Sequence, residues 1–128
     1  MKAELTEIME KIITTSYSDV GSIELLLEYG FVLNQHIART GQLMSEAKET
    51  LHRKRLTAYQ LISSSPKTPG AKLSPMLLKE YVNDSCSVEN GLYELAERAN
   101  RAATHANDLV RTAISALKQE RYSSQFQN

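Results

Sequence analysis

The chain has 128 residues, a length that suits one domain, and its 41% hydrophobic and 23% charged residues are unlike those of a membrane-embedded or disordered protein. Basic and acidic residues balance at 15 each, so no overall charge draws the chain to nucleic acid or to a membrane. The single cysteine, Cys86, excludes an intrachain disulfide and favours a cytoplasmic location.

Residues 3–14 predict a short first helix, because their apolar side chains recur at helical spacing on one face. This start contains three glutamates and no unbroken apolar segment, so it does not resemble a signal peptide. No apolar run in the chain reaches a transmembrane length, and we expect no membrane contact. A connector rich in Ser, Thr and Gly follows over residues 14–22.

Residues 23–63 predict a long helix whose apolar positions alternate four and three residues apart. Thr40 and Lys54 are the weak positions of this seam. Gly30 and Gly41 each cost about 1 kcal/mol in helix propensity. Two interpretations stay open at these glycines: a break near Gly30, or close contact with another helix at both.

The Ser-, Pro- and Gly-rich residues 64–73 predict a connector, since two prolines and a glycine end a helix. A third helix is predicted over residues 75–120. Its N-terminus has a clear start signal, because Ser74 suits the N-cap and proline suits the first helical position. The poor helix formers at 83–87 predict either a kink or a fresh start. We expect the polar tail 121–128 to fray.

The stretch 88–117 carries three almost wholly apolar columns at heptad spacing, which predicts a long helix packed along its length. The fold class is therefore all-α, a long antiparallel helical hairpin with a short N-terminal helix. A hairpin covers one or two of the columns, and a second copy would cover the third, so we expect a homo-oligomer, most simply a dimer. The alternative is a monomeric three-helix bundle. The predicted core and oligomer interface comprises Leu92, Leu95, Ala96, Ala99, Ala102, Ala103, Ala106, Leu109, Val110, Ala113 and Leu117.

The hairpin tip is basic, with seven cations and one acid between residues 48 and 79. Such a tip could contact the phosphates of a nucleic acid. The simpler interpretation is a solvated turn, because a window widened to residues 46–84 gains three acids and only Tyr59 interleaves as an aromatic. The candidate nucleic-acid-binding residues are Lys48, Arg53, Lys54, Arg55, Lys67, Lys72 and Lys79.

No pattern in the sequence predicts catalysis. Glu49 and His52 have the Glu-x-x-His spacing of helical di-metal sites, but both lie off the apolar seam, which predicts an exposed pair. Cys86 has no histidine near it in the sequence and is expected to be a buried small residue. Phosphate loops, metal-spaced Cys/His sets and Ser/His/Asp arrangements are also missing. We expect no catalytic residue, no metal and no cofactor.

Three segments carry a family resemblance: residues 38–48, residues 103–115 and Leu73-Ser74-Pro75. Together they resemble small helical proteins of phage and prophage gene sets. The resemblance carries no known activity, and it implies a role in DNA handling, virion assembly or host modulation. The sequence as a whole predicts a non-enzymatic interaction protein that oligomerises and contacts a protein partner, and the alternative is a nucleic-acid accessory protein.

Overall fold

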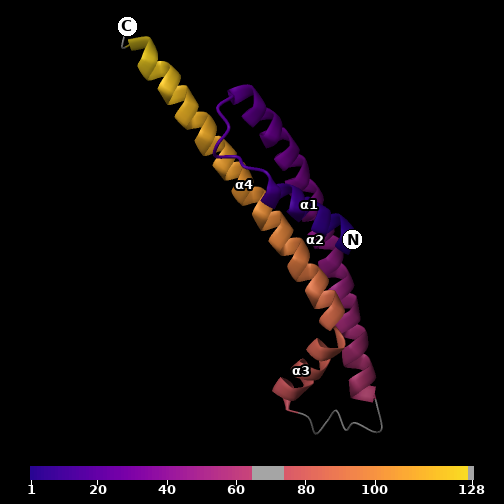
Figure 1. Ribbon diagram of the computed structural model, residues 1–128. Helices are drawn as coiled ribbons and strands as arrows, with labels where there is room; N and C mark the ends of the chain where they lie inside the picture. The colour runs from indigo at the N-terminus through magenta and orange to yellow at the C-terminus, as the bar shows by residue number, and fades with distance from the viewer. Residues whose placement is uncertain (65–73, 127–128) are drawn as a thin grey trace.

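The computed structural model describes residues 1–64 and 74–126, in which four helices and no strand occur. The helices are α1 (Lys2–Thr14), α2 (Ile23–Ser64), α3 (Pro75–Ser85) and α4 (Ser87–Phe126). α2 and α4 lie side by side in opposite directions and form an elongated hairpin (Figure 1). The predicted all-α hairpin with a short N-terminal helix is confirmed.

α2 is one unbroken helix of 42 residues, about 63 Å long at 1.5 Å per residue. Both of its glycines face α4. A Cβ atom built on Gly30 would lie 3.6 Å from Val110 Cγ1, and one built on Gly41 would lie 3.7 Å from Asn100 Nδ2. The expected alternative of a break near Gly30 is therefore wrong, and both glycines mark positions where α2 contacts α4.

The prediction of a single helix over residues 75–120 is wrong, because a non-helical residue, Cys86, separates two helices, α3 and α4. Cys86 has φ −112° and ψ 21°, and its N–H donates to the carbonyl of Asn83 at 3.0 Å. The alternative predicted for residues 83–87, a new helix starting there, is confirmed, since α4 begins at Ser87. The break lets the buried Val82 and Cys86 pack beside Leu51 and Ala58 of α2.

The two ends of the α3–α4 segment differ in how well they were predicted. Ser74 is the N-cap of α3, and its hydroxyl accepts a hydrogen bond from the Leu77 N–H at 3.2 Å, as expected. At the other end α4 continues to Phe126, so the described part of the tail expected to fray is helical. Residues 118–126 contain neither Pro nor Gly, so nothing in their chemistry stops the helix.

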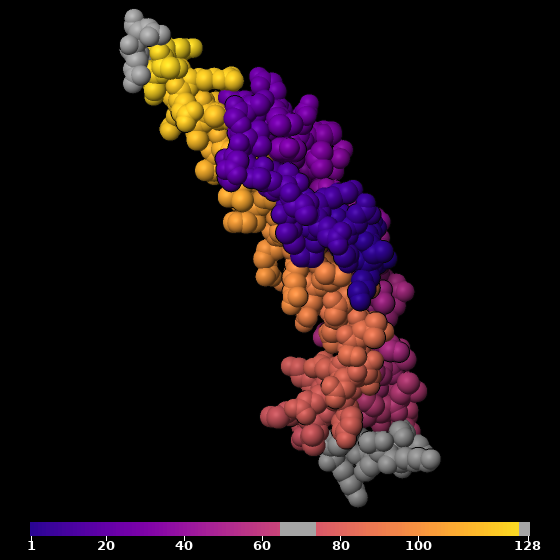
Figure 2. Space-filling model, in the orientation of Figure 1, coloured from indigo at the N-terminus to yellow at the C-terminus, as the bar shows by residue number. Residues whose placement is uncertain are grey.

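The core forms where α1 lies on the α2–α4 pair. Leu5 of α1 packs with Leu43 and the alanines at 96 and 99, and Ile8 and Ile12 pack in a cluster that includes Leu26, Leu33 and Ala103. α1 has 13 residues and covers only about 20 Å of the much longer pair. Figure 2 shows α1 over the middle of the rod, with α4 extending beyond it in both directions.

Candidate functional site

Two of the three apolar columns of α4 are largely covered within the chain. Ala96, Ala103 and Val110 are buried in one column, and Ala99 and Ala106 are buried in another. These five residues belong to the core, which is one of the two roles predicted for the core and oligomer interface. α1 and α2 together cover the two columns, which explains why small residues, mostly alanine, occupy them.

The third column of α4 stays partly open beside α1. Leu95 and Ala102 are half-buried, and 43% of Leu109 is exposed. The other predicted interface residues, Leu92, Ala113 and Leu117, are half-buried at the edges of the core clusters. The prediction of one leftover apolar column thus matches the exposure that the described residues show.

Three adjoining hollows follow the open column of α4: one beside the start of α1, one beside its end, and a middle one lined by α4 alone. We call this surface the α1–α4 groove; its apolar lining includes Met1, Ile13 of α1, and Val88, Leu95, Ala102 and Leu109 of α4. Its widest part, about 700 Å³, lies beside Met1, where α1 begins and α4 is no longer covered. Ile13 is 72% exposed and Val88 is 79% exposed, so both ends of the groove present apolar surface to solvent.

The charged residues around the α1–α4 groove are mostly basic. The cations Lys2, Arg98 and Arg101 line it, against the single acid Glu94. Arg101 forms an ion pair with Glu97, one turn away on α4. Lys2 and Arg98 form no ion pair within the described part of the chain. The groove therefore combines an apolar floor with two cations that lack a partner there.

Two contacts hold α1 in the position that shapes the groove. The guanidinium of Arg39 on α2 donates to both carboxylate oxygens of Glu4, at 2.6 and 3.0 Å. These hydrogen bonds hold the pKa of Glu4 below its ordinary value. At the other end, the rings of Tyr17 and Tyr29 meet edge to face at 5.5 Å, and burial raises the pKa of Tyr17.

Two candidate nucleic-acid-binding residues, Lys48 and Arg55, line a polar cleft of about 300 Å³ between α2 and α4, together with His52. Lys48, His52 and Arg55 occupy one face of α2, since they are spaced by four and three residues. Arg55 Nη2 donates to Asn90 Oδ1 at 3.1 Å across the interface. The cleft is also lined by the acids Glu94 and Glu97, which lower its positive charge.

The other candidate cations do not join this cleft. Arg53 forms an ion pair with Glu49 on the preceding turn. Lys54 and Lys79 are exposed on α2 and α3. The candidates Lys67 and Lys72 lie outside the described residues. The described cations of the tip are thus divided among several faces and accompanied by acids.

The residues considered for metal or covalent chemistry are not assembled into a site. Among the described residues, no group of three His, Cys, Asp or Glu side chains is close enough to hold a metal ion. Glu49 of the Glu-x-x-His pair is engaged by Arg53, and Cys86 is fully buried beside apolar side chains. Burial and the nearby charge of Lys11 lower the pKa of another histidine, His36 of α2.

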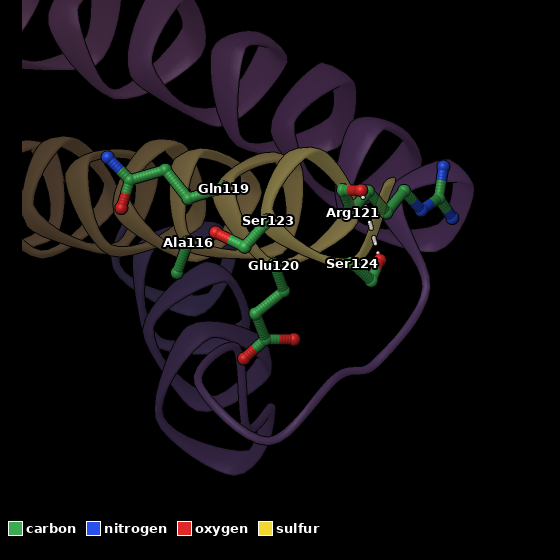
Figure 3. A pocket seen from close by; sticks show the side chains of 6 residues that line it. All are labelled: Ala116, Gln119, Glu120, Arg121, Ser123 and Ser124. Carbon is green, nitrogen blue, oxygen red and sulfur yellow. Dashed lines mark hydrogen bonds between the residues drawn. The ribbon is translucent and has the colours of Figure 1, made fainter. Parts of the chain in front are cut away.

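A further depression lies at the C-terminal end of α4 (Figure 3). Its lining residues all come from this one helix, and a side-chain hydrogen bond between them runs from the Ser124 hydroxyl to the carbonyl of Arg121 at 3.0 Å. A surface built by one helix does not enclose a ligand. The residues are Ala116, Gln119, Glu120, Arg121, Ser123 and Ser124.

Comparison of the chain with protein-family models, with curated proteins and with solved structures finds no match in any of the three. No described helix has a stretch that is both long enough and apolar enough to cross a membrane. The case for a function therefore depends on the surfaces described above.

Sequence reasoning identified the α4 wall of the groove but not its α1 wall. Met1 and Ile13 were not singled out as surface residues, although Ile13 lies at the edge of the apolar face of α1. The signal that could have revealed them is the length of the first helix, which is too short to cover the hairpin.

Proposed function

We propose that this chain is a non-enzymatic helical interaction protein that self-associates through the α1–α4 groove. The observation that supports it most directly is the open apolar column formed by Leu95, Ala102 and Leu109 beside α1. A long apolar surface on a small protein is typical of a protein–protein contact. Docking a helix there would remove apolar surface from water, at about 25 cal/mol per Å² buried.

The shape and charge of the groove define what it would accept. From Val88 to Leu109 it follows 21 residues of α4, about 32 Å, which is room for a helix of five to six turns. Its floor needs an apolar helix face, and Lys2 and Arg98 favour acidic side chains beside that face. An amphipathic helix from a second copy, with acidic flanks, meets these requirements.

Self-association also fits the family resemblance. A protein that assembles through helix faces suits the virion-assembly role that the resemblance to phage and prophage proteins implies. We include a phage origin in the proposal on this ground, and a cytoplasmic location because the chain has a single cysteine.

The alternative, a nucleic-acid accessory protein, has weaker support. Phosphate binding needs several cations on one surface with few acids among them. Lys48 and Arg55 share their cleft with Glu94 and Glu97, and Arg53 is paired with Glu49. The charges of the described tip therefore favour a solvated end over a phosphate-binding surface.

Sedimentation velocity over micromolar concentrations tests the proposal. We expect the wild-type chain to self-associate as its concentration rises, and Leu109→Glu to remove this association, since a carboxylate would then sit in the apolar groove. Leu56→Glu is the matched control, because Leu56 is 59% exposed on α2, away from the groove. A wild-type monomer at all concentrations, or equal association of both variants, would contradict the proposal.

A further inference from the structure

One face of α2 has the chemistry that the α1–α4 groove requires. Glu24, Leu27, Glu28 and Phe31 are spaced at i, i+3, i+4 and i+7, so they form one continuous strip of the helix surface. We call this strip the α2 face. All four residues are exposed, with 58% of Leu27 and 68% of Phe31 accessible to solvent.

The α2 face points away from its own hairpin. The residues of α2 that pack against the rest of the chain in this region are Ile23, Leu26 and Leu33, which lie on a different side of the helix. Leu27 and Phe31 follow Leu26 by one and five positions, a rotation of about 100 to 140° around the helix axis. A copy therefore leaves both its α2 face and its α1–α4 groove unused.

The charges of the two surfaces are complementary. Glu24 and Glu28 stand one turn apart, an arrangement in which like charges repel by a few tenths of a kcal/mol. Hydrogen bonds to its own backbone N–H and to Ser22 lower the pKa of Glu24, and the nearby charge of Arg121 on α4 adds a smaller effect, so Glu24 is charged at neutral pH but not wholly free of its own hairpin. The groove offers Lys2 and Arg98, which form no ion pair within the described part of the chain.

From these observations, and resting on the proposed function, we propose that the α2 face of one copy docks in the α1–α4 groove of another. Leu27 and Phe31 lie on the open column of α4, and Glu24 and Glu28 meet Lys2 and Arg98. The contact joins two different surfaces, so it is heterologous. Each added copy leaves one groove and one α2 face open, and the assembly grows beyond a dimer into a ring or a filament.

Two variants, each inactivating one surface, test this arrangement by sedimentation velocity and light scattering. Phe31→Lys removes an apolar contact from the α2 face and places a cation against the basic groove. Leu95→Glu inactivates the groove beside Lys2 and Arg98, the part that the α2 face would occupy. Leu61→Lys and Leu56→Glu are the matched controls, because both residues are exposed on α2 toward the hairpin tip.

We expect the wild type and both controls to grow beyond dimers with concentration, and each test variant alone to be monomeric. An equimolar mixture of the two test variants should form a 1:1 pair and stop there, since each supplies the surface that the other lacks. Circular dichroism establishes that each variant keeps its helical content.

Charge reversal gives a second test that leaves the apolar contacts intact. Arg98→Glu and Glu28→Lys should each weaken assembly at least tenfold, and the double variant should recover most of it. Two results would overturn the inference. If Phe31→Lys assembles like the wild type while Leu95→Glu does not, the groove binds a different surface, and the proposed function survives. If the wild type is monomeric throughout, the inference and the proposed function both fail.

Discussion

Asn100 of α4 donates a hydrogen bond of 3.1 Å to the hydroxyl of Thr40 of α2, across the centre of the hairpin. The same amide donates to the carbonyl of Ile37 at 3.1 Å, and the Thr40 hydroxyl donates to the carbonyl of His36 at 2.7 Å. Thr40 is fully buried. This polar link fixes the register of the two helices, because a slip by one turn would separate Asn100 from both of its acceptors.

Replacing Asn100 should therefore destabilise the hairpin. We expect Asn100→Ala to lower the free energy of unfolding by about 1–3 kcal/mol, since a buried acceptor loses its donor and the side chain leaves a gap. Urea denaturation followed by circular dichroism measures the change. The matched control is Asn90→Ala, whose side chain accepts only from Arg55 near the tip. An equal loss of unfolding free energy in both variants would show that the Asn100–Thr40 link stabilises the hairpin no more than the contact near the tip.

The contact glycines of α2 give an opposite expectation. A methyl group at Gly30 or Gly41 meets side-chain atoms only at ordinary van der Waals distance, 3.6 to 3.9 Å. Alanine should thus gain helix propensity without a clash, and we expect Gly30→Ala and Gly41→Ala each to stabilise by up to about 1 kcal/mol in thermal unfolding.

Gly91 supplies the control for this prediction, because a Cβ there meets nothing within 4 Å and Gly91→Ala reports propensity alone. Gly30→Leu should instead destabilise, because Val110 would have to move. Destabilisation by Gly30→Ala would mean that α2 and α4 approach more closely than the structure shows.

The hairpin was predictable because its signals are periodic and local. The heptad columns of α4 and the Ser74–Pro75 start each follow from spacing or capping chemistry in the sequence. The break at Cys86 was only one of two options, because poor helix formers allow a break but do not require one. Packing of Cys86 beside Leu51 and Ala58 decides it, and such contacts join residues far apart in the chain.

The candidate site was predictable only in part, for the same reason. The surplus of apolar columns on α4 indicated an uncovered surface, whereas its location depends on where α1 lies. Docking of α1 uses Leu5 and the ion pair between Glu4 and Arg39, and Glu4 is separated from Arg39 by 35 residues. No local pattern specifies such a contact.

The Glu4–Arg39 ion pair should make stability depend on pH. The pKa of Glu4 in the folded chain lies below its ordinary value of 4.5. The pair therefore stabilises the fold at pH values above 4.5, and this contribution is lost as the pH falls through the folded-state pKa. We expect Glu4→Gln to lower the melting temperature at pH 7 and to leave it nearly unchanged once the pH is well below the ordinary value.

Glu10→Gln is the control for this prediction, because Glu10 is also on α1 and forms no ion pair within the described residues. Its melting temperature should follow the wild type across the same pH range. A difference between Glu4→Gln and Glu10→Gln that persists in acid would show that Glu4 acts by packing, not by charge.

Nucleic-acid binding gives a direct test between the two candidate functions. Because acids accompany Lys48 and Arg55 in their cleft, we expect duplex and single-stranded DNA to cause no salt-dependent mobility shift even at low ionic strength. A shift that disappears in the double variant Arg53→Glu with Arg55→Glu would favour the nucleic-acid alternative. A shift that this variant keeps would place DNA binding elsewhere on the chain.

The hairpin tip should open more easily than the rest of the molecule. α3 has 11 residues and packs through a small cluster in which Val82 and Cys86 are buried. Few buried contacts hold such a segment, so it is expected to open locally without global unfolding. A thiol reagent should label Cys86 slowly in the native chain, and Val82→Ala should speed the labelling about tenfold or more, because it weakens the α3 contact by roughly 1.4 kcal/mol or more. Leu5→Ala, which weakens the distant α1 contact, is the control and should change the rate much less. If Val82→Ala and Leu5→Ala speed the labelling of Cys86 equally, then α3 unfolds only with the whole hairpin.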